Sequence, residues 1–490
     1  MGRDVEDREF TRDDRTKYRI KVRRSLDALG RMLSEYDFSL GRPMAGIEIE
    51  FNLIDQEGLP ALRNTEALRA IDMDSFQTEL AQYNVEINVP PRHIDGDGLE
   101  VFETTIREKL NAAEEKAQTV DAGLMMIGIL PTLTQEHMTG DVISENPRYR
   151  LLSEQIIAAR GEDIEILIDG ADRFHTTSDT ILPEAACTST QFHIQVEPED
   201  FASWWNAAQT IAGVQIAMGA NSPFLLGNEL WHETRIALFE QATDTRSEEL
   251  KAQGVRPRVW FGERWITSVF DLFEENVRYF PALLPILEDE DPIAEIEAGR
   301  VPQLAELSLH NGTVYRWNRP IYDINDGQPH LRIENRVLPA GPTVVDIMAN
   351  AAFYFGLTAA LVKSDRPIWS RMSFQAAEDN FHRAAKQGIT AEQYWPTVGT
   401  MPANRLVQEH LLPLAYEGLA TLDADPAQAR RLLGVIEGRC ETGQNGATWL
   451  AKRFHGYLAK GSDRFEAMRR TTLDYADGMH SNTPVHTWTA

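Results

Sequence analysis

Four short runs of alternating apolar and polar residues constrain the fold of this chain more than any other feature of its sequence. Residues 46–53 read Gly-Ile-Glu-Ile-Glu-Phe-Asn-Leu, and similar runs occupy residues 84–89, 190–196 and 331–337. Successive side chains of a β-strand point to opposite faces, so each run predicts a strand with one apolar and one polar face. The sequence therefore predicts a sheet whose strands come from distant parts of the chain.

The polar faces of these strands hold an unusual set of residues. Every polar position on them is Glu, His, Asn, Gln or Arg, and none is Lys, Ser or Thr, the usual residues of a solvent-exposed face. One such strand alone is most simply a strand with one face in water. Four together favour a shared functional face. Its charged members are Glu48, Glu50, Glu86, His193, Arg332, Glu334 and Arg336.

Carboxylates on this face predict a cation site. Glu48 and Glu50 stand two residues apart on one strand, so their backbones would lie about 6.5 Å apart on the same face. Like charges about 4 Å apart repel each other by roughly 4 kcal/mol at an effective dielectric constant of 20, so gathered carboxylates imply raised pKa values or bound cations. Oxygen ligands with one imidazole suit Mg²⁺ or Mn²⁺ better than Zn²⁺. Mg²⁺ usually binds with phosphates, for which Arg332 and Arg336 would supply planar cations.

Charge and cysteine content narrow the class of protein. The 48 basic and 75 acidic residues give a formal net charge of −27, which disfavours nucleic acid and anionic membrane surfaces as partners. Only Cys187 and Cys440 are present, and neither belongs to a Cys-X-X-Cys motif, so a reducing cytoplasm is expected. Residues 1–8 lack an apolar signal segment. The apolar stretch at residues 347–362 is shorter than a membrane span and predicts a buried helix.

The order of the predicted elements indicates an α+β chain with three parts. Residues 1–40 predict a helical N-terminal segment, residues 41–365 a mixed α+β domain, and residues 366–490 a helical region packed on that domain. No strand is expected beyond about residue 345. The chain has no phosphate-binding loop, dinucleotide-binding, zinc-protease or serine-hydrolase motif.

Five motifs in a fixed order carry a family resemblance. They are Gly46-Ile-Glu-Ile-Glu50, Glu79 leading into Glu86-Ile-Asn-Val-Pro-Pro91, Gln191-Phe-His-Ile-Gln195, Gly219-Ala-Asn-Ser-Pro223 and Arg332-Ile-Glu-Asn-Arg336. With these motifs the chain resembles glutamate-cysteine ligase family 2, the bacterial carboxylate-amine ligases of the glutamine synthetase superfamily. The resemblance covers residues 40–365. It implies a glutamine synthetase-like fold, in which a twisted, mostly antiparallel sheet forms a catalytic funnel with flanking helices.

The resemblance also implies roles for individual residues. Arg336 would contact the transferring phosphate, with Glu334 beside it in the catalytic centre. Arg235, Arg319 and Arg332 would contact substrate or ATP, although ordinary salt bridges explain Arg235 and Arg319 equally well. Glu79 is expected at the edge of the cavity. The implied metal ligands are Glu48, Glu50, Glu79, Glu86, His193 and Glu334.

The implied reaction is ATP-dependent amide formation between glutamate and an amine, with Mg²⁺ or Mn²⁺ as the metal. ATP would convert the γ-carboxylate into an acyl phosphate, which the amine then attacks. Cysteine is the first amine to consider, which would place the reaction in low-molecular-weight thiol biosynthesis. Two other interpretations stay open: a phosphotransferase of the guanidino kinase type, and a non-catalytic, metal-stabilised binding protein. The sequence identifies neither the amine nor the carboxylate, and leaves a homo-oligomer open.

Overall fold

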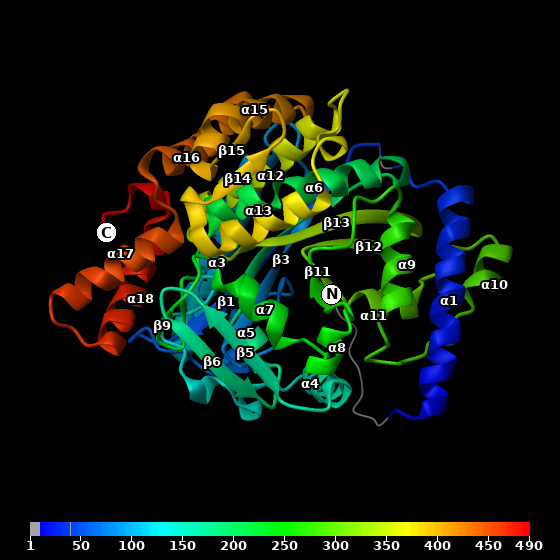
Figure 1. Ribbon diagram of the computed structural model, residues 1–490, viewed down its shortest axis with the longest axis horizontal. Helices are drawn as coiled ribbons and strands as arrows, with labels where there is room; N and C mark the ends of the chain where they lie inside the picture. The colour runs from blue at the N-terminus through cyan, green and yellow to red at the C-terminus, as the bar shows by residue number, and fades with distance from the viewer. Residues whose placement is uncertain (1–9, 40) are drawn as a thin grey trace.

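A twisted antiparallel sheet forms the centre of the molecule in the computed structural model, which describes residues 10–39 and 41–490 (Figure 1). The strand order is β12-β13-β7-β1-β3-β2, and β4 pairs with β1. The four predicted strands are β1, β3, β7 and β13, which confirms the sheet expected from the sequence. The strands are β1 (Met44–Ile54), β2 (Phe76–Thr78), β3 (Asn84–His93), β4 (Gly123–Met125), β7 (Ser189–Gln195), β12 (Asn318–Asn325) and β13 (Gln328–Pro339).

The strand register places the polar residues of neighbouring strands side by side. Glu50 of β1 lies opposite Glu86 of β3, and Glu334 of β13 lies opposite His193 of β7. Directly opposed residues of an antiparallel pair project from the same face of the sheet. Four segments that are distant in sequence therefore contribute to one polar face.

The other face of the sheet packs against helices and forms the core. Ile47, Ile49, Ile87, Ile194 and Ile333 are each at most 1% exposed, which confirms their prediction as the buried face. The helices α3 (Gly98–Ala117), α6 (Pro198–Gly219) and α12 (Val344–Val362) contribute to this layer. On β7, the ring of Phe192 stacks on Tyr354 of α12 with the ring centroids 6.0 Å apart.

Helix α12 is a core helix. Among the described residues it is the one helix long and apolar enough to cross a membrane, yet 94% of its apolar window is buried inside the protein. It packs against α6 and against two C-terminal helices, α15 (Leu412–Thr421) and α16 (Pro426–Thr442). The prediction of a buried helix at residues 347–362 is therefore confirmed.

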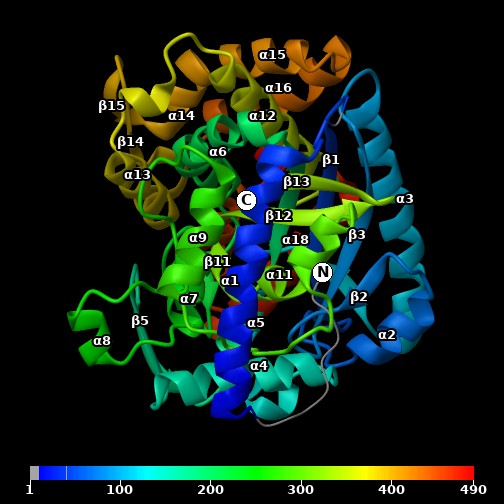
Figure 2. The same cartoon turned by 90° about the vertical axis from the view of Figure 1, so that its right-hand side faces the viewer.

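Helix α1 (Arg12–Glu35) lies along one side of the molecule, beside three shorter helices within residues 269–311 (Figure 2). Thr11 and Asp14 form a capping box at its start, and Leu29 and Met32 on its apolar stripe are fully buried. Residues 1–9 and 40 of the predicted N-terminal segment lie outside the described residues. The neighbouring helices are α9 (Val269–Tyr279), α10 (Pro292–Glu297) and α11 (Ala305–Asn311).

The C-terminal region is mainly helical, but the expectation that it contains no strand is wrong. Strands β14 (Glu392–Trp395) and β15 (Gly399–Pro402) form a hairpin. Four-residue strands are too short to show a period of two in the sequence. Tertiary contacts hold this hairpin, since buried Gln393 donates to the Asn380 carbonyl at 3.0 Å. The remaining helices here are α13 (Phe374–Gln387), α14 (Ala403–Leu406), α17 (Gly446–Ala459) and α18 (Arg464–Ser481).

Short elements between β4 and β12 cover the polar face of the sheet. Several of them line the cavities described below, notably α4, α5, α7 and β11. The helices are α4 (Pro147–Arg160), α5 (Leu182–Ala185), α7 (Thr234–Ala242) and α8 (Glu248–Ala252), and α2 (Asn64–Ile71) precedes β2. The strands are β5 (Ile164–Asp169), β6 (Arg173–Ser178), β8 (Phe224–Leu225), β9 (Asn228–Glu229), β10 (Val259–Trp260) and β11 (Tyr315–Arg316).

Candidate active site

Two adjoining cavities lie over the polar face of the sheet. The first, of about 360 Å³, is lined by Glu50, Glu79, Glu86 and Arg336 and is called the acid cavity here. The second, of about 420 Å³, is lined by His193, Glu334 and Arg332 together with apolar side chains, and is called the outer cavity. Four residues line both cavities and mark their junction. These are Glu48, Arg148, Gly312 and Arg319.

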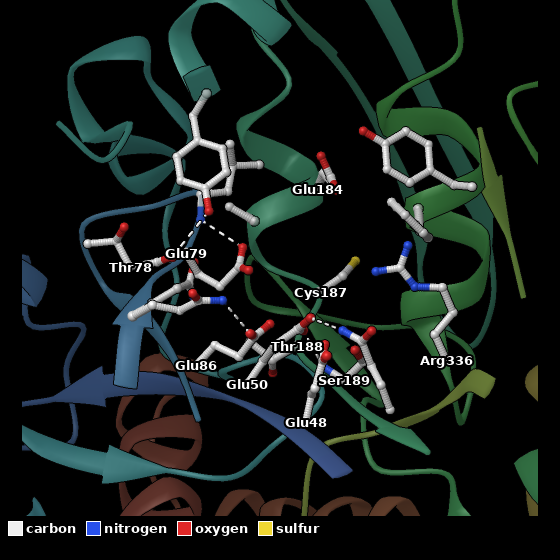
Figure 3. Close-up of a pocket in the computed structure, with 18 of the residues that line it drawn as sticks. Glu48, Glu50, Thr78, Glu79, Glu86, Glu184, Cys187, Thr188, Ser189 and Arg336 are labelled. Carbon is white, nitrogen blue, oxygen red and sulfur yellow. Dashed lines mark hydrogen bonds between the residues drawn. The ribbon is translucent and has the colours of Figure 1, made fainter. Parts of the chain in front are cut away.

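Three carboxylates gather at the floor of the acid cavity (Figure 3). Glu50, Glu79 and Glu86 each offer an oxygen within 4.8 Å of the others, and this is the one such group found among the described residues. Glu79, expected at the cavity edge, is the partly exposed member of this group, whereas Glu50 and Glu86 are buried. Glu79 follows β2, and β2 pairs with β3 so that Gln77 lies opposite Glu86. This pairing carries the next turn of the chain, and Glu79 with it, into the cluster.

Hydrogen bonds hold two of these carboxylates in place. Glu50 accepts from the Ser189 backbone N–H at 2.5 Å and from Gln191 Nε2 at 2.9 Å. Glu86 accepts from Gln77 Nε2 at 2.7 Å and from Asn88 Nδ2 at 2.8 Å. The donors come from the neighbouring strands β7 and β2 and from β3 itself, so the sheet positions the cluster.

Burial and mutual repulsion disfavour the charged form of the cluster. Burial, and then the charge of Glu79, raise the pKa of Glu50 to about 7. Burial raises the pKa of Glu86 well above its usual range, and the neighbouring carboxylates raise it further. Burial also raises the pKa of Glu79. A cation between the three groups would remove this cost, and three oxygen donors without a thiol fit Mg²⁺ or Mn²⁺.

Glu48, His193 and Glu334 form a second charged group, at the junction and in the outer cavity. His193 Nε2 lies 3.2 Å from Glu48 Oε1, and His193 holds the pKa of Glu48 below its usual range although burial opposes this. Glu334 lies 2.8 Å from Arg319 Nη2 and 3.5 Å from Arg336 Nε. These guanidinium groups hold the Glu334 pKa low despite burial. Thus five of the six predicted ligands share one sheet face, Glu79 joins them from the turn after β2, and the six divide into two groups.

The predicted arginines differ in how they are engaged. Arg235 donates to Glu233 at 2.9 Å and to the Val337 carbonyl, so its salt bridge positions the end of β13. Arg332 donates to Asp323 at 2.9 Å and lies 3.3 Å from His193 Nδ1. The ion pairs of Arg319 and Arg336 with Glu334 leave Nη1 of Arg336 buried without a hydrogen-bond partner among the described residues.

Two charged side chains of the acid cavity escaped prediction from the sequence. Arg148 comes from α4 and Glu184 from α5, and both line the cavity opposite the sheet. Neither side chain forms a hydrogen bond or ion pair with another described residue. Each interacts with charged groups only at longer range, across the cavity. No sequence signal marks them, since one lies in an ordinary helical run and the other in a single helical turn. Burial raises the pKa of Glu184 to about 8.

Comparison with known families identifies the chain. The family model for glutamate-cysteine ligase family 2 matches residues 44–467. The chain belongs to glutamate-cysteine ligase family 2. The region that matches this family begins with β1 and ends within α18, so it includes every site residue described above. No curated protein sequence gives a significant match.

One solved structure agrees with the family assignment at the level of the fold, and two others have lower similarity. The glutamate-cysteine ligase from Francisella tularensis, crystallised with AMP, matches with a TM-score of 0.55 and 11% identity, over 91% of this chain and 90% of that one. A bifunctional glutathione synthetase from Pasteurella multocida has a TM-score of 0.45 and 12% identity, over 92% and 54%. The ligase PafA, solved in complex with the ubiquitin-like protein Pup, has a TM-score of 0.39 and 10% identity, over 92% and 79%.

Proposed function

We propose that this member of glutamate-cysteine ligase family 2 is an ATP-dependent carboxylate-amine ligase that joins the γ-carboxylate of glutamate to an amine. One observation carries the proposal: a three-carboxylate cluster and the unpaired Nη1 of Arg336 line the same cavity over one sheet face. The AMP complex of the similarly folded ligase supports the use of ATP. Cysteine is the first amine to assay, because the family carries its name.

In this proposal the first step is phosphoryl transfer. An oxygen of the γ-carboxylate attacks the γ-phosphorus of ATP, and ADP leaves. Glu50, Glu79 and Glu86 would hold Mg²⁺ or Mn²⁺, which neutralises phosphate oxygens when bound. Arg336 would donate from Nη1 to the transferring group. Glu334 accepts two hydrogen bonds from Arg319 and so orients that guanidinium group, and its charge attracts Arg336, whose Nε lies 3.5 Å away.

The second step is attack by the amine. Its nitrogen forms a bond to the acyl carbon, the carbon–oxygen bond to phosphate breaks, and the nitrogen loses a proton. Phosphate departs with one oxygen of the former carboxylate. Arg235 contributes indirectly, because it binds the carbonyls of Val337 and Arg336 and so supports the backbone that carries the Arg336 side chain.

A phosphate-release assay tests the proposal, with glutamate held constant and a panel of amines that includes hydroxylamine. We expect ADP and orthophosphate in equal amounts, dependent on a divalent cation, glutamate and an amine. A stable phosphorylated product without orthophosphate would instead indicate a phosphotransferase of the guanidino kinase type. Thermal stabilisation by Mg²⁺ and ATP without turnover on any amine would indicate a non-catalytic binding protein.

A further inference from the structure

The wall of the acid cavity opposite the sheet combines one carboxylate with aromatic rings. Glu184 of α5 lies on this wall, away from Glu48 and Glu50 and across Cys187 from Arg336 (Figure 3). Tyr315 and Phe239 line the same cavity and pack edge to face, with ring centroids 5.3 Å apart. This wall also includes Arg148, Tyr149, Leu152 and Ala185.

Glu184 is the one acid of this wall, and no described residue pairs with it. Its side chain lines the cavity without a hydrogen bond or salt bridge from the rest of the described chain. Burial and the nearby Glu79 disfavour its charged form, whereas Arg336 favours it. A cationic group placed beside Glu184 would pair with this carboxylate in a partly dehydrated environment, where charged hydrogen bonds are strong.

Two of the four arginines that line the acid cavity are already paired with carboxylates of the protein. Four arginines supply all the positive charge among the described lining residues, and Arg235 and Arg319 are engaged by Glu233 and Glu334. Arg148 and Nη1 of Arg336 remain to bind anionic groups of the substrates. The proposed reaction brings two anionic groups, the transferring phosphoryl group and the α-carboxylate of glutamate. If Arg148 and Arg336 bind these groups, no guanidinium group of the acid cavity is left for the carboxylate of a second amino acid, and Arg332 of the outer cavity is paired with Asp323.

We propose that Glu184 binds the ammonium group of the acceptor, which releases one proton to solvent before its neutral nitrogen attacks the acyl carbon, and that this acceptor is an amine without a carboxylate beside its amino group. The inference rests on the proposed function and adds the substrate class. The aromatic rings of this wall would pack against an apolar acceptor body. An α-amino acid would bury an unpaired carboxylate against Glu184 and these rings, which is unfavourable.

Matched acceptor pairs that differ only in the carboxylate test this inference: cysteamine against cysteine, and tyramine against tyrosine. Each is assayed with the parent protein, ATP, Mg²⁺ and glutamate. We expect kcat/KM to be at least about tenfold higher for the amine of each pair, the scale of one unpaired buried group. Equal or higher values for cysteine and tyrosine would overturn the inference.

Substitutions at Glu184 test the residue itself. Glu184→Gln should lower kcat/KM for cysteamine at least about tenfold more than for hydroxylamine, which is uncharged at neutral pH and needs no ammonium partner. Glu184→Arg should shift the preference within each pair toward the amino acid. Glu154→Gln, on the exposed side of α4, is the matched control. An equal loss with all acceptors would contradict the assigned role.

Hydroxylamine separates failure of this inference from failure of the proposed function. Formation of γ-glutamyl hydroxamate together with a preference for cysteine over cysteamine would overturn the inference and leave the ligase function standing. Absence of hydroxamate and of phosphate release with every acceptor would overturn both.

Discussion

Glu334 lies between two guanidinium groups, with Arg319 and Arg336 on opposite carboxylate oxygens. Glu334, expected among the metal ligands, already balances positive charge through this pairing. Its two hydrogen bonds orient Arg319, and Arg336 has an unpaired Nη1 that lines the cavity. In the proposed reaction Glu334 would support phosphoryl transfer by orienting Arg319 and attracting Arg336, whereas the separate group of Glu50, Glu79 and Glu86 is suited to bind a cation.

Arg336→Lys tests the role of that guanidinium group. Lysine keeps the charge but loses the planar group that can bind two oxygens of a transferring phosphoryl group. We expect turnover to fall roughly a hundredfold or more, the scale of one lost transition-state donor, with little change in melting temperature. Arg173→Lys, an exposed position on β6, is the control. Turnover within a fewfold of the parent would show that Arg336 does not contact the transferring group.

Glu86→Gln tests the electrostatic cost of the carboxylate cluster. The folded-state pKa of Glu86 is raised, so the parent loses stability as pH rises above the ordinary Glu pKa. In EDTA, we expect the variant to be more stable than the parent by about 1 to 3 kcal/mol at pH 8 and equal to it near pH 4.

Urea unfolding with EDTA and with Mg²⁺ measures both parts of this prediction. Mg²⁺ should stabilise the parent and stabilise Glu86→Gln much less, because the variant offers a weaker ligand. Glu57→Gln, an exposed position after β1, is the control. A variant that is less stable than the parent in EDTA, or that responds equally to Mg²⁺, would contradict a cation site at this cluster.

At the scale of elements, the sequence predicts the parts of the site that lie on long regular strands. In β1, β3, β7 and β13 the period of two places Glu50, Glu86, His193 and Glu334 on one face. The position of Glu79 could not be predicted, because β2 has only three residues and the following turn directs the side chain. The opposite wall escaped prediction for a similar reason. Helix α5 is a single turn, and its placement depends on packing between distant segments.

The contact between α7 and α13 predicts a pH-dependent stability. His382 Nε2 lies 2.9 Å from Glu240 Oε1, and Glu240 outweighs burial and raises the pKa of His382 to about 9. Stability from this pair is fully present below pH 6.5 and is lost as pH rises through about 9. The side chains are 34% and 25% exposed, so solvent screening limits the stabilisation to about 1 kcal/mol.

Urea unfolding of Glu240→Gln at pH 6, 8 and 10 measures this stabilisation. We expect the parent to be more stable than the variant at pH 6 and equal to it at pH 10. Glu392→Gln, an exposed position at the start of β14, should show no such trend. A difference that stays constant with pH would exclude protonation of His382 as its cause.

At the scale of the whole molecule, the C-terminal helices contact the layer behind the catalytic sheet. Arg439 of α16 lies 2.7 Å from Asp346 of α12, and both side chains are at most 1% exposed. Arg439 also donates to Asn350 at 2.7 Å. The division of the chain at residue 365 stays a prediction. These contacts make the stability of residues 41–365 and that of residues 366–490 depend on each other.

Arg439→Met tests this interdependence. Removing the guanidinium group leaves Asp346 buried without its main cationic partner, so we expect the free energy of unfolding to fall by about 3 to 5 kcal/mol. The loss should appear in one cooperative transition that also abolishes activity. Arg430→Met, an exposed position on the same helix, should change stability little. Separate melting of residues 366–490 with retained activity would show two independent parts.

The most direct test of the ligase assignment follows oxygen from substrate to product. Glutamate labelled with ¹⁸O in its γ-carboxylate is incubated with the protein, ATP, Mg²⁺ and an amine, and the released orthophosphate is analysed by mass spectrometry. An acyl phosphate intermediate predicts ADP and orthophosphate that carries one ¹⁸O atom, because phosphate departs with an oxygen of the carboxylate. Unlabelled orthophosphate, or AMP in place of ADP, would contradict activation of glutamate by phosphoryl transfer.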